Sequence, residues 1–454
     1  MSAAAALHRQ GVALLRLGAR EQGIARLRAA LAARPDFAAA RIDLADALLA
    51  DGQPAAAAEA YRAALAAAPR QPLLHLHLGL ALRAAGQDDA ARDSFARALA
   101  LDPRLAAAHA GQARVLSERN RHAEALAGFR RAVELEPGQP VHRWNAALSA
   151  LALGDYAQGW RDYEARWRLD VFPAAKRALP APRWTGAEDV AGRTVLVWAE
   201  QGFGDTFQFA RYLPLLAARG ARVVLEAQGP ACRLLARTQG VATVVEQGAE
   251  LPPHDLHCPL LSLPLAFATT LATVPAAVPY LHADPAEVAA WRARLAGRGR
   301  IAVGLVWAGN WRAGHPLALR SDRRRAVDPG LLGPLAAVPG VAFVSLQKEA
   351  QRSPPETMML HDWTAELTDF AATAALVAAL DLVIGVDTAV THLAGALGRP
   401  VWLLNRFDSD WRWLLDRADS PWYPSMCIFR PPAQDAWAPV VAAAAAALRE
   451  RLGG

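Results

Sequence analysis

The sequence predicts a mixed α + α/β protein, in which a solenoid of helical repeats precedes two lobes built on parallel sheets. A first observation is the constant step of about 34 residues between four prolines: Pro35, Pro69, Pro103 and Pro137. A second is the change of pattern at Thr194, after which short apolar strands alternate with amphipathic helices. A third is the length of 454 residues, which exceeds that of one ordinary core.

Two further series of residues keep the same step as the prolines. Gly or Asn occupies one phase, where it lets the chain turn with positive φ between two helices: Gly18, Gly52, Gly86, Asn120 and Gly154. A large apolar side chain occupies another, where it packs the second helix of each pair: Leu27, Tyr61, Phe95, Phe129 and Tyr163. The prolines end these second helices because proline cannot continue the hydrogen-bond ladder. The pattern is typical of tetratricopeptide repeats, and we expect about five units over residues 1–170, with a concave face that binds a protein or peptide.

Composition indicates a folded globular protein. Hydrophobic residues make up 53% and charged residues 20% of the chain. The net charge of +6 is carried almost entirely by Arg, since Lys176 and Lys348 are the only lysines, and both signs are interspersed. We attribute this balance to coding bias and expect no nucleic-acid partner, because the repeats also lack the aromatic and basic alternation of single-strand binders.

The spacing of the cysteines and the hydropathy of the chain indicate its cellular compartment. Cys232, Cys258 and Cys427 are far apart and match no metal-site spacing, so we expect a reducing compartment, no disulfide framework and no metal. The first residues form too short an apolar stretch for a signal peptide. The longest apolar run, 370–386, is interrupted by Asp381 and Gly385, so it reads as a buried helix and strand. We expect a cytoplasmic protein without a transmembrane segment.

The α/β part divides into a linker and two lobes. Prolines mark a linker over 171–193, and the first lobe covers 194–284 with strands at 195–198 and 221–226 around a helix at 206–218. The second lobe covers 285–454 and opens with a helix at 285–298. Its strands are expected at 301–307, 341–346, 382–386 and 401–404, with helices near Leu331 and at 370–380, 391–397 and 436–452. Two such Rossmann-like units in tandem suggest a ligand site between them.

The first candidate site is the turn 200–205, which contains Gly202, Gly204 and Asp205 and follows the first strand of the first lobe. Ligands of open α/β sheets bind at this end of a strand. Asp205 suits a carboxylate that accepts a proton, with Glu200 as the alternative base. The structural alternative is that Asp205 simply caps the helix starting at Thr206.

The second candidate is the segment 385–394, which follows a buried strand and opens a helix. Free N–H groups at such a helix start can hold a diphosphate. The Thr388 hydroxyl could add a donor, and His392 could donate to a phosphate oxygen. Alternatively, Asp387 and Thr388 only cap the helix, and His392 is a satisfied, half-buried side chain.

Two further clusters have the right chemistry to bind a phosphate group or to stack on a ring. Arg320, Arg323, Arg324 and Arg325 surround Asp322 in what we expect to be a long loop, and Arg binds phosphate well; a solvated loop is the alternative. Indoles alternate with charged residues in the segments 408–413 and 419–424, which could stack on a sugar or a base. The alternative is a core patch that closes a lobe, and we assign Trp413 to the core.

The segment 385–394 resembles the Asp-Thr-x-x-x-His-Leu-Ala motif of the ADP-heptose:lipopolysaccharide heptosyltransferase family, and Gly204-Asp205 resembles that family's Gly-Asp turn. The resemblance extends over about 194–452. The whole layout is similar to bacterial proteins with amino-terminal tetratricopeptide repeats and a heptosyltransferase-like domain, which the segments 199–202, 306–310, 410–413 and 420–424 also fit.

The resemblance implies a GT-B glycosyltransferase whose second lobe binds the nucleotide-sugar donor and whose first lobe faces the acceptor, without a metal or other cofactor. Asp205 would be the catalytic base. The implied donor-binding residues are Asn310, Arg325, Asp387, Thr388, Ala389, His392, Asp410 and Trp411, and the acceptor side holds Gln201, Gly202 and Gly204. The chain departs from the family at Ala389, where Gly is frequent. It also lacks a clear match for a lysine after the first strand of the second lobe, which Arg312, His315 or Arg325 could replace.

Three functions follow from these observations. The first is inverting transfer of a sugar to a protein held by the repeats, an architecture similar to that of O-GlcNAc transferases. The second is a non-catalytic scaffold with a degenerate GT-B domain, which the missing lysine motivates. The third is transfer to lipopolysaccharide or another glycan, with the repeats serving assembly.

Overall fold

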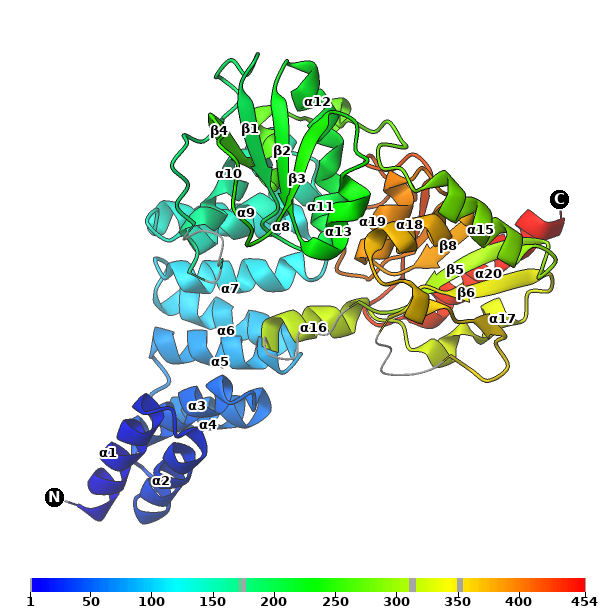
Figure 1. Ribbon diagram of the computed structural model, residues 1–454. Coiled ribbons are helices and arrows are strands. Elements are labelled where there is room, and N and C mark those ends of the chain that lie inside the picture. The colour runs from blue at the N-terminus through cyan, green and yellow to red at the C-terminus, as the bar shows by residue number, and fades with distance from the viewer. Residues whose placement is uncertain (1, 171, 173–176, 310–315, 349–353, 454) are drawn as a thin grey trace. The chain divides into compact units, whose positions relative to one another are not determined.

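The computed structural model describes residues 2–170, 172, 177–309, 316–348 and 354–453 (Figure 1). The chain forms two compact units, Met1–Ser149 and Ala150–Gly454. The first unit is helical, and the second contains both parallel sheets. None of the helices in the described ranges is long and apolar enough to cross a membrane.

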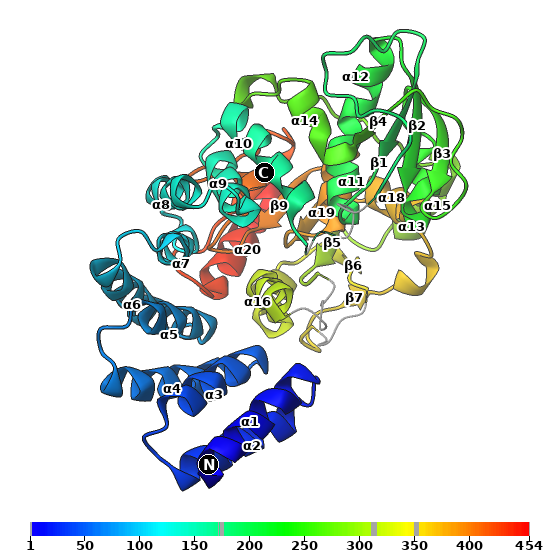
Figure 2. The same ribbon diagram turned by 90° about the vertical axis from the view of Figure 1, so that its left-hand side faces the viewer.

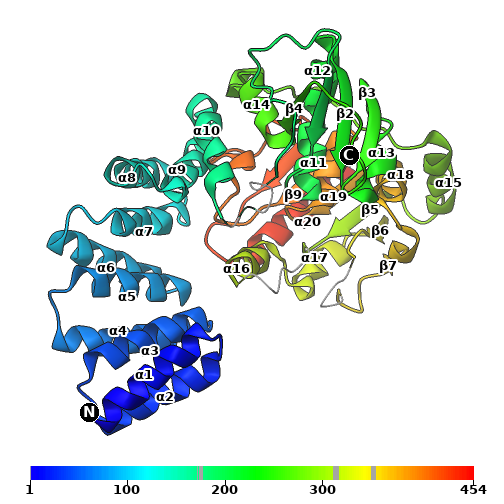
Figure 3. The same ribbon diagram turned by 60° about the vertical axis from the view of Figure 1, so that its left-hand side comes forward.

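Antiparallel helix pairs build the first unit, as the period predicts (Figures 2 and 3). The helices are α1 (Ala3–Arg16), α2 (Arg20–Ala33), α3 (Ala38–Ala50), α4 (Pro54–Ala67), α5 (Pro72–Ala84), α6 (Asp88–Leu101), α7 (Ala106–Ser117), α8 (His122–Leu135) and α9 (Pro140–Ala152), the last of which extends into the second unit. Each residue of the Gly or Asn series has a positive φ, from 60° at Asn120 to 81° at Gly18. Each of the four prolines follows the end of a second helix.

The large apolar side chains of the repeats are buried where the helices come closest. Phe95 is fully buried between Gly79 on α5 and Gly111 on α7. A Cβ atom on either glycine would lie 2.6 Å from a ring carbon of Phe95. The absence of a side chain at these two positions therefore sets the spacing of α5, α6 and α7.

A second repeated contact joins consecutive helix pairs. The Nε2 atoms of His75 and His109 lie 2.9 and 3.0 Å from the carbonyl oxygens of Pro69 and Pro103, and Arg41 donates to the carbonyl of Pro35. The next helix thus satisfies the carbonyls of Pro35, Pro69 and Pro103, whereas His142 contacts the Glu136 carboxylate.

The first lobe of the second unit holds a parallel sheet in the order β3-β2-β1-β4. Its strands are β1 (Thr194–Trp198), β2 (Arg222–Ala227), β3 (Val241–Glu246) and β4 (Leu256–Pro259), and its helices include α11 (Phe203–Phe209), α12 (Leu213–Ala218), α13 (Gly229–Leu235) and α14 (Leu263–Ala266). The expected continuous helix 206–218 is wrong, because a 3-10 turn at Ala210–Tyr212 separates α11 from α12. The helix also begins at Phe203, so Asp205 lies inside its first turn and does not precede it.

The second lobe holds a parallel sheet in the order β10-β9-β8-β5-β6-β7. Its strands are β5 (Ile301–Val306), β6 (Val341–Ser345), β7 (Leu360–His361), β8 (Leu382–Gly385), β9 (Val401–Leu404) and β10 (Met426–Phe429), and its helices are α15 (Pro285–Leu295), α16 (Pro316–Arg325), α17 (Gly333–Ala336), α18 (Phe370–Ala379), α19 (Ala389–Ala396) and α20 (Trp437–Gly453). The arginine cluster is therefore on a helix, α16, and the expected loop is wrong. One core joins α20 to the strands, while α18 and α19 lie on the side of the sheet toward the first lobe (Figure 3).

Aromatic side chains tie helix α10 (Tyr156–Tyr163) to both lobes. Trp160 of α10 contacts Phe209 of the first lobe and Trp411 of the second, with ring centroids 6.0 and 5.2 Å apart. The Trp422 indole donates to the Tyr156 hydroxyl over 3.1 Å. Helix α10, the last of the repeat series, is thus part of the α/β unit and contacts both of its lobes.

Candidate functional site

The carboxyl ends of β8 and β9 bring the second-lobe candidates to one edge of the sheet. Asp387 and Thr388 connect β8 to α19, and the Thr388 N–H donates to the Thr391 Oγ1 atom over 3.0 Å. The Thr388 hydroxyl is buried and has no hydrogen-bond partner within the described ranges. The first N–H groups of α19 likewise have no intrahelical acceptor. This helix start can therefore donate hydrogen bonds to an anion.

His392 links Asp387 to the body of the lobe. Its Nε2 atom lies 3.4 Å from the Asp387 carboxylate, and its Nδ1 atom lies 2.9 Å from the Tyr423 hydroxyl. The ring stacks on Trp413 at 5.2 Å. Burial alone would raise the pKa of Asp387, but the hydrogen bond and charge of His392 hold it well below its usual range. Asp387 is accordingly ionised at neutral pH.

The turn of the first lobe touches this helix directly. Gly204 lies against His392, since a Cβ atom on Gly204 would lie 2.9 Å from the His392 Cδ2 atom. The next residue, Asp205, accepts a hydrogen bond from the Gly202 N–H over 3.1 Å. The structure therefore brings the Gly-Asp turn and the Asp-Thr segment together, although they lie in different lobes.

Arg412 completes this contact; the sequence placed it in the candidate segment 408–413 but did not single it out. It is only 8% exposed, and its guanidinium donates to Asp205, to Gln208 over 2.7 Å and to Asp410 over 2.8 Å. Burial alone would lower the pKa of Arg412, but the carboxylates of Asp410 and Asp205 raise it above its usual range. The one available signal was a charged residue between two indoles, Trp411 and Trp413.

The arginines of α16 reach the same edge of the second sheet. Arg325 donates to the Asp387 carbonyl over 3.4 Å, and its other terminal nitrogen pairs with Asp322 at 2.8 Å. Arg324 pairs with Asp408, which follows β9, at 3.0 Å. The Arg325 guanidinium thus lies beside the start of α19, where an anion would be attracted.

Two family models match separate parts of the chain. A tetratricopeptide repeat family model matches residues 8–72 and 76–140, and the model of glycosyltransferase family 9 (heptosyltransferase) matches residues 359–406. Protein FlbA from Caulobacter vibrioides is 31% identical over 354 residues, which cover 69% of this chain and 56% of FlbA. The chain thus spans little more than half of that relative.

The chain carries amino-terminal tetratricopeptide repeats and, over residues 359–406, is similar to glycosyltransferase family 9. The predicted resemblance is confirmed in both parts, and the family 9 match contains Asp387, Thr388, Ala389 and His392. Asp205, Arg325, Asp410 and Trp411 lie outside the matched range.

Among solved structures, the repeats are similar to MamA from Desulfovibrio magneticus RS-1 at 27% identity and a TM-score of 0.28, covering 29% of this chain and 75% of MamA. They are similar to PilF from Pseudomonas aeruginosa at 24% identity and a TM-score of 0.33, covering 36% of this chain and 74% of PilF. A thermophilic repeat protein from Thermus thermophilus matches at 23% identity and a TM-score of 0.33, covering 38% of this chain and 94% of its own.

Two other predicted site residues, Glu200 and Trp411, have partners within the fold. Glu200 pairs with the buried Arg166 at 2.9 Å and accepts from the Leu261 N–H, and burial raises the pKa of Glu200 to about 7 against the charge of Arg166. Trp411 is 5% exposed and packs in the aromatic cluster of α10. Glu200 and Trp411 thus have structural partners that account for them.

The remaining predictions have different outcomes. The Gln201 side chain donates to the Tyr163 hydroxyl over 3.0 Å, which places it at the base of the first-lobe turn. Ala389 is the first residue of α19, next to Thr388. Asn310, Arg312 and His315 lie outside the described residues. Sequence reasoning also missed Gln347, whose side-chain oxygen accepts from the Trp307 and Ala308 N–H groups and so shapes the loop after β5.

Proposed function

We propose that the α/β unit transfers a sugar from a nucleotide-sugar to an acceptor hydroxyl, with inversion and without a metal. The observation that carries this proposal is the contact of Gly204 with His392. This contact brings two groups close together. One is the Asp205 carboxylate, which we expect to activate the acceptor, and the other is the start of α19, which we expect to hold the donor. A transferase needs these two groups side by side.

The donor diphosphate would bind at the start of α19. The unpartnered Thr388 hydroxyl, the free N–H groups of the first turn and the Arg325 guanidinium all favour a dianion there. These groups would stabilise the negative charge of the departing diphosphate, which is the part that a divalent metal plays elsewhere.

The chemical step would be a single displacement. Asp205 takes the proton of the acceptor hydroxyl while the oxygen forms a bond to the anomeric carbon. The bond from that carbon to the diphosphate oxygen breaks, and its electron pair remains on the diphosphate. Attack from the face opposite the leaving group inverts the configuration.

The acceptor would be a protein held by the tetratricopeptide repeats, because solenoids of this kind present extended surfaces to polypeptides. This part of the proposal rests on architecture, and a glycan acceptor is the alternative that a transfer assay would identify.

A nucleotide screen tests the donor site first. We expect one of ADP, UDP, GDP, CDP or CMP to raise the melting temperature and to bind saturably in calorimetry. Thr388→Val and Arg325→Ala should weaken that binding, whereas Arg417→Ala should not, because Arg417 pairs with the exposed Asp419 away from α19. Binding that is insensitive to Thr388 and Arg325 would reject this site.

The scaffold function has one specific observation in its favour. Both carboxylate oxygens of Asp205 accept hydrogen bonds, from Arg412 and from Gly202. If no nucleotide of the panel binds, this engaged carboxylate is a structural anchor, and the repeats carry the function.

A further inference from the structure

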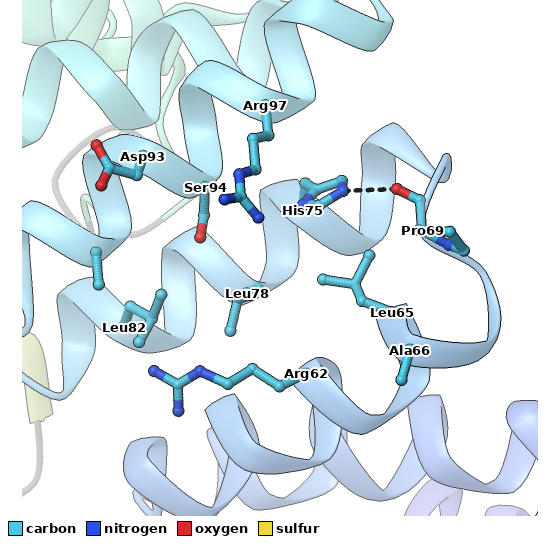
Figure 4. A pocket seen from close by; sticks show the side chains of 11 residues that line it. Arg62, Leu65, Ala66, Pro69, His75, Leu78, Leu82, Asp93, Ser94 and Arg97 are labelled. Carbon is cyan, nitrogen blue, oxygen red and sulfur yellow. Dashed lines mark hydrogen bonds between the residues drawn. The ribbon is translucent and has the colours of Figure 1, made fainter.

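A pocket of about 470 Å³ lies in the first unit between α4, α5 and α6 (Figure 4). Its apolar surface comes from Leu65, Leu78 and Leu82. Arg62 on α4 and Arg97 on α6 approach it from opposite sides. The pocket thus lies over α5, the first helix of one repeat. It is flanked by α6, the second helix of the same repeat, and by α4, the second helix of the repeat before it.

The polar groups of this pocket have unused hydrogen-bonding capacity. Within the described part of the chain, Arg97 makes no ion pair or hydrogen bond. Arg62 has only one partner there, the neutral Gln87 side chain at 3.3 Å. Ser94 and His75 line the pocket and are each 7% exposed. The Ser94 hydroxyl makes no hydrogen bond to a described residue, and the buried His75 Nδ1 atom has no partner there either.

The charge of the pocket is positive. Asp93 is the acidic residue of its lining, and this carboxylate is largely exposed and lies 3.8 Å from Arg92 on the same helix. Arg62 and Arg97 therefore flank the leucine surface without a carboxylate between them among the described lining residues. An anionic group with an apolar neighbour fits this arrangement, while a cationic ligand would be repelled.

The pairing of these arginines is specific to one place in the repeats. One repeat earlier the same two phases hold Arg28 and Ala63, and one repeat later they hold Ala96 and Arg131. Arg131 is moreover paired with Glu134 at 2.8 Å. The repeat framework alone thus does not account for two arginines around a shared apolar surface.

We propose that this pocket binds a short peptide segment in which a carboxylate side chain is flanked by leucine-sized apolar side chains. The Arg62 and Arg97 guanidinium groups bind the carboxylate, and the leucines bury the flanking side chains. A volume of about 470 Å³ suits one or two such side chains. The identity of the partner as an acceptor rests on the proposed function, but the binding itself does not.

Fluorescence anisotropy on the full chain tests the proposal with labelled nonapeptides of Gly and Ser around a central triplet. We expect the Leu-Glu-Leu peptide to bind saturably and about tenfold more tightly than the Leu-Gln-Leu and Ala-Glu-Ala peptides. Replacing both arginines (Arg62→Ala with Arg97→Ala) should weaken binding at least about tenfold. Arg131→Ala, at the same repeat phase as Arg97, should leave it unchanged.

A charge swap separates recognition from folding. Arg97→Glu should weaken binding of the Leu-Glu-Leu peptide and strengthen that of a Leu-Lys-Leu peptide, which an unfolded variant could not do. Equal binding of the Glu and Gln peptides, an unaffected double variant, or no saturable binding at millimolar peptide would overturn the proposal. Nucleotide binding in the α/β unit is read separately, so failure of one proposal is distinguishable from failure of the other.

Discussion

Arg412 of the second lobe donates a hydrogen bond to the carboxylate of Asp205 in the first lobe. The same guanidinium binds Gln208, one helical turn further along α11, and Asp410 beside it. One buried cation thus holds the proposed base against the donor-side lobe. The orientation of Asp205 therefore depends on the closeness of the lobes as well as on its own helix.

Asp205→Asn should reduce sugar transfer by about 10²–10⁴-fold, because an amide cannot accept the proton of the acceptor hydroxyl. Nucleotide binding should persist, since Asp205 lies on the acceptor side. The measurement is product formation with the donor that the nucleotide screen identifies. Asp419→Asn is the matched control, as Asp419 pairs with Arg417 near the surface. Full activity of the Asp205→Asn variant would remove this carboxylate from the mechanism.

Arg412→Gln should disturb the orientation of Asp205. The Arg412 guanidinium donates to Asp205, Gln208 and Asp410 at once. Without it the proposed base loses its contact with the second lobe, so we expect sugar transfer to fall by about tenfold while nucleotide binding persists.

The same variant should lower the free energy of unfolding by about 3 kcal/mol, because it breaks a buried ion pair. Arg417→Gln serves as the control, and Arg412→Lys should restore part of the transfer rate. A variant that loses stability but keeps the wild-type transfer rate would show that Arg412 only holds the lobes together.

His257→Gln should make the free energy of unfolding less dependent on pH in the acidic range. Burial, with the nearby charges of Arg183 and Arg177, lowers the pKa of His257 from 6.5 to about 4. Between these values the unfolded chain binds a proton that the folded chain does not, so folding loses stability as pH falls. The Gln side chain still accepts from the Trp198 indole, which lies 3.2 Å from the His257 Nδ1 atom.

On going from neutral pH to pH 4.5, the His257→Gln variant should lose about 1–2 kcal/mol less unfolding free energy than the wild type. This figure allows for the partial exposure of His257. Urea unfolding at several pH values measures it. The exposed His282, changed to Gln, provides the control. An acid limb identical to that of the wild type would contradict the prediction.

Gly79→Ala should destabilise the repeats by about 1–3 kcal/mol, because its Cβ atom would overlap the Phe95 ring, which is held on its other side by Gly111. Gly138→Ala is the matched control, since no atom lies within 4 Å of a Cβ atom built there. Urea denaturation followed by circular dichroism distinguishes the two. Equal stability of both variants would mean that the helices adjust their spacing freely.

Removal of metal ions should leave transfer activity within about twofold of its starting value, because N–H groups, Thr388 and Arg325 would supply the stabilisation of the diphosphate. Activity before and after dialysis against EDTA measures this. A loss that added Mg²⁺ or Mn²⁺ reverses would show that the proposed donor site is incomplete without a cation.

The order of elements followed from the sequence wherever the signal was local. The repeat phases of Gly, Pro and the aromatics predicted the helix pairs, since each residue acts within its own turn. The strands β3, β4, β7 and β10 were missed, because short strands at or near sheet edges carry little apolar periodicity. The arginine cluster was placed in a loop because its charges conceal the helix period of α16.

The sequence by itself determined the repeat helices, the inner strands of both sheets, and which motifs stand at the carboxyl ends of those strands. Only the tertiary structure decided which charges meet. Glu200 was predicted as the alternative base to Asp205, and the fold pairs it with Arg166, 34 positions earlier in the chain. Arg412 reaches Asp205 across 207 positions. Such pairs depend on the path of the whole chain, because packing between elements decides which side chains meet. The spacing of residues along the sequence does not predict them.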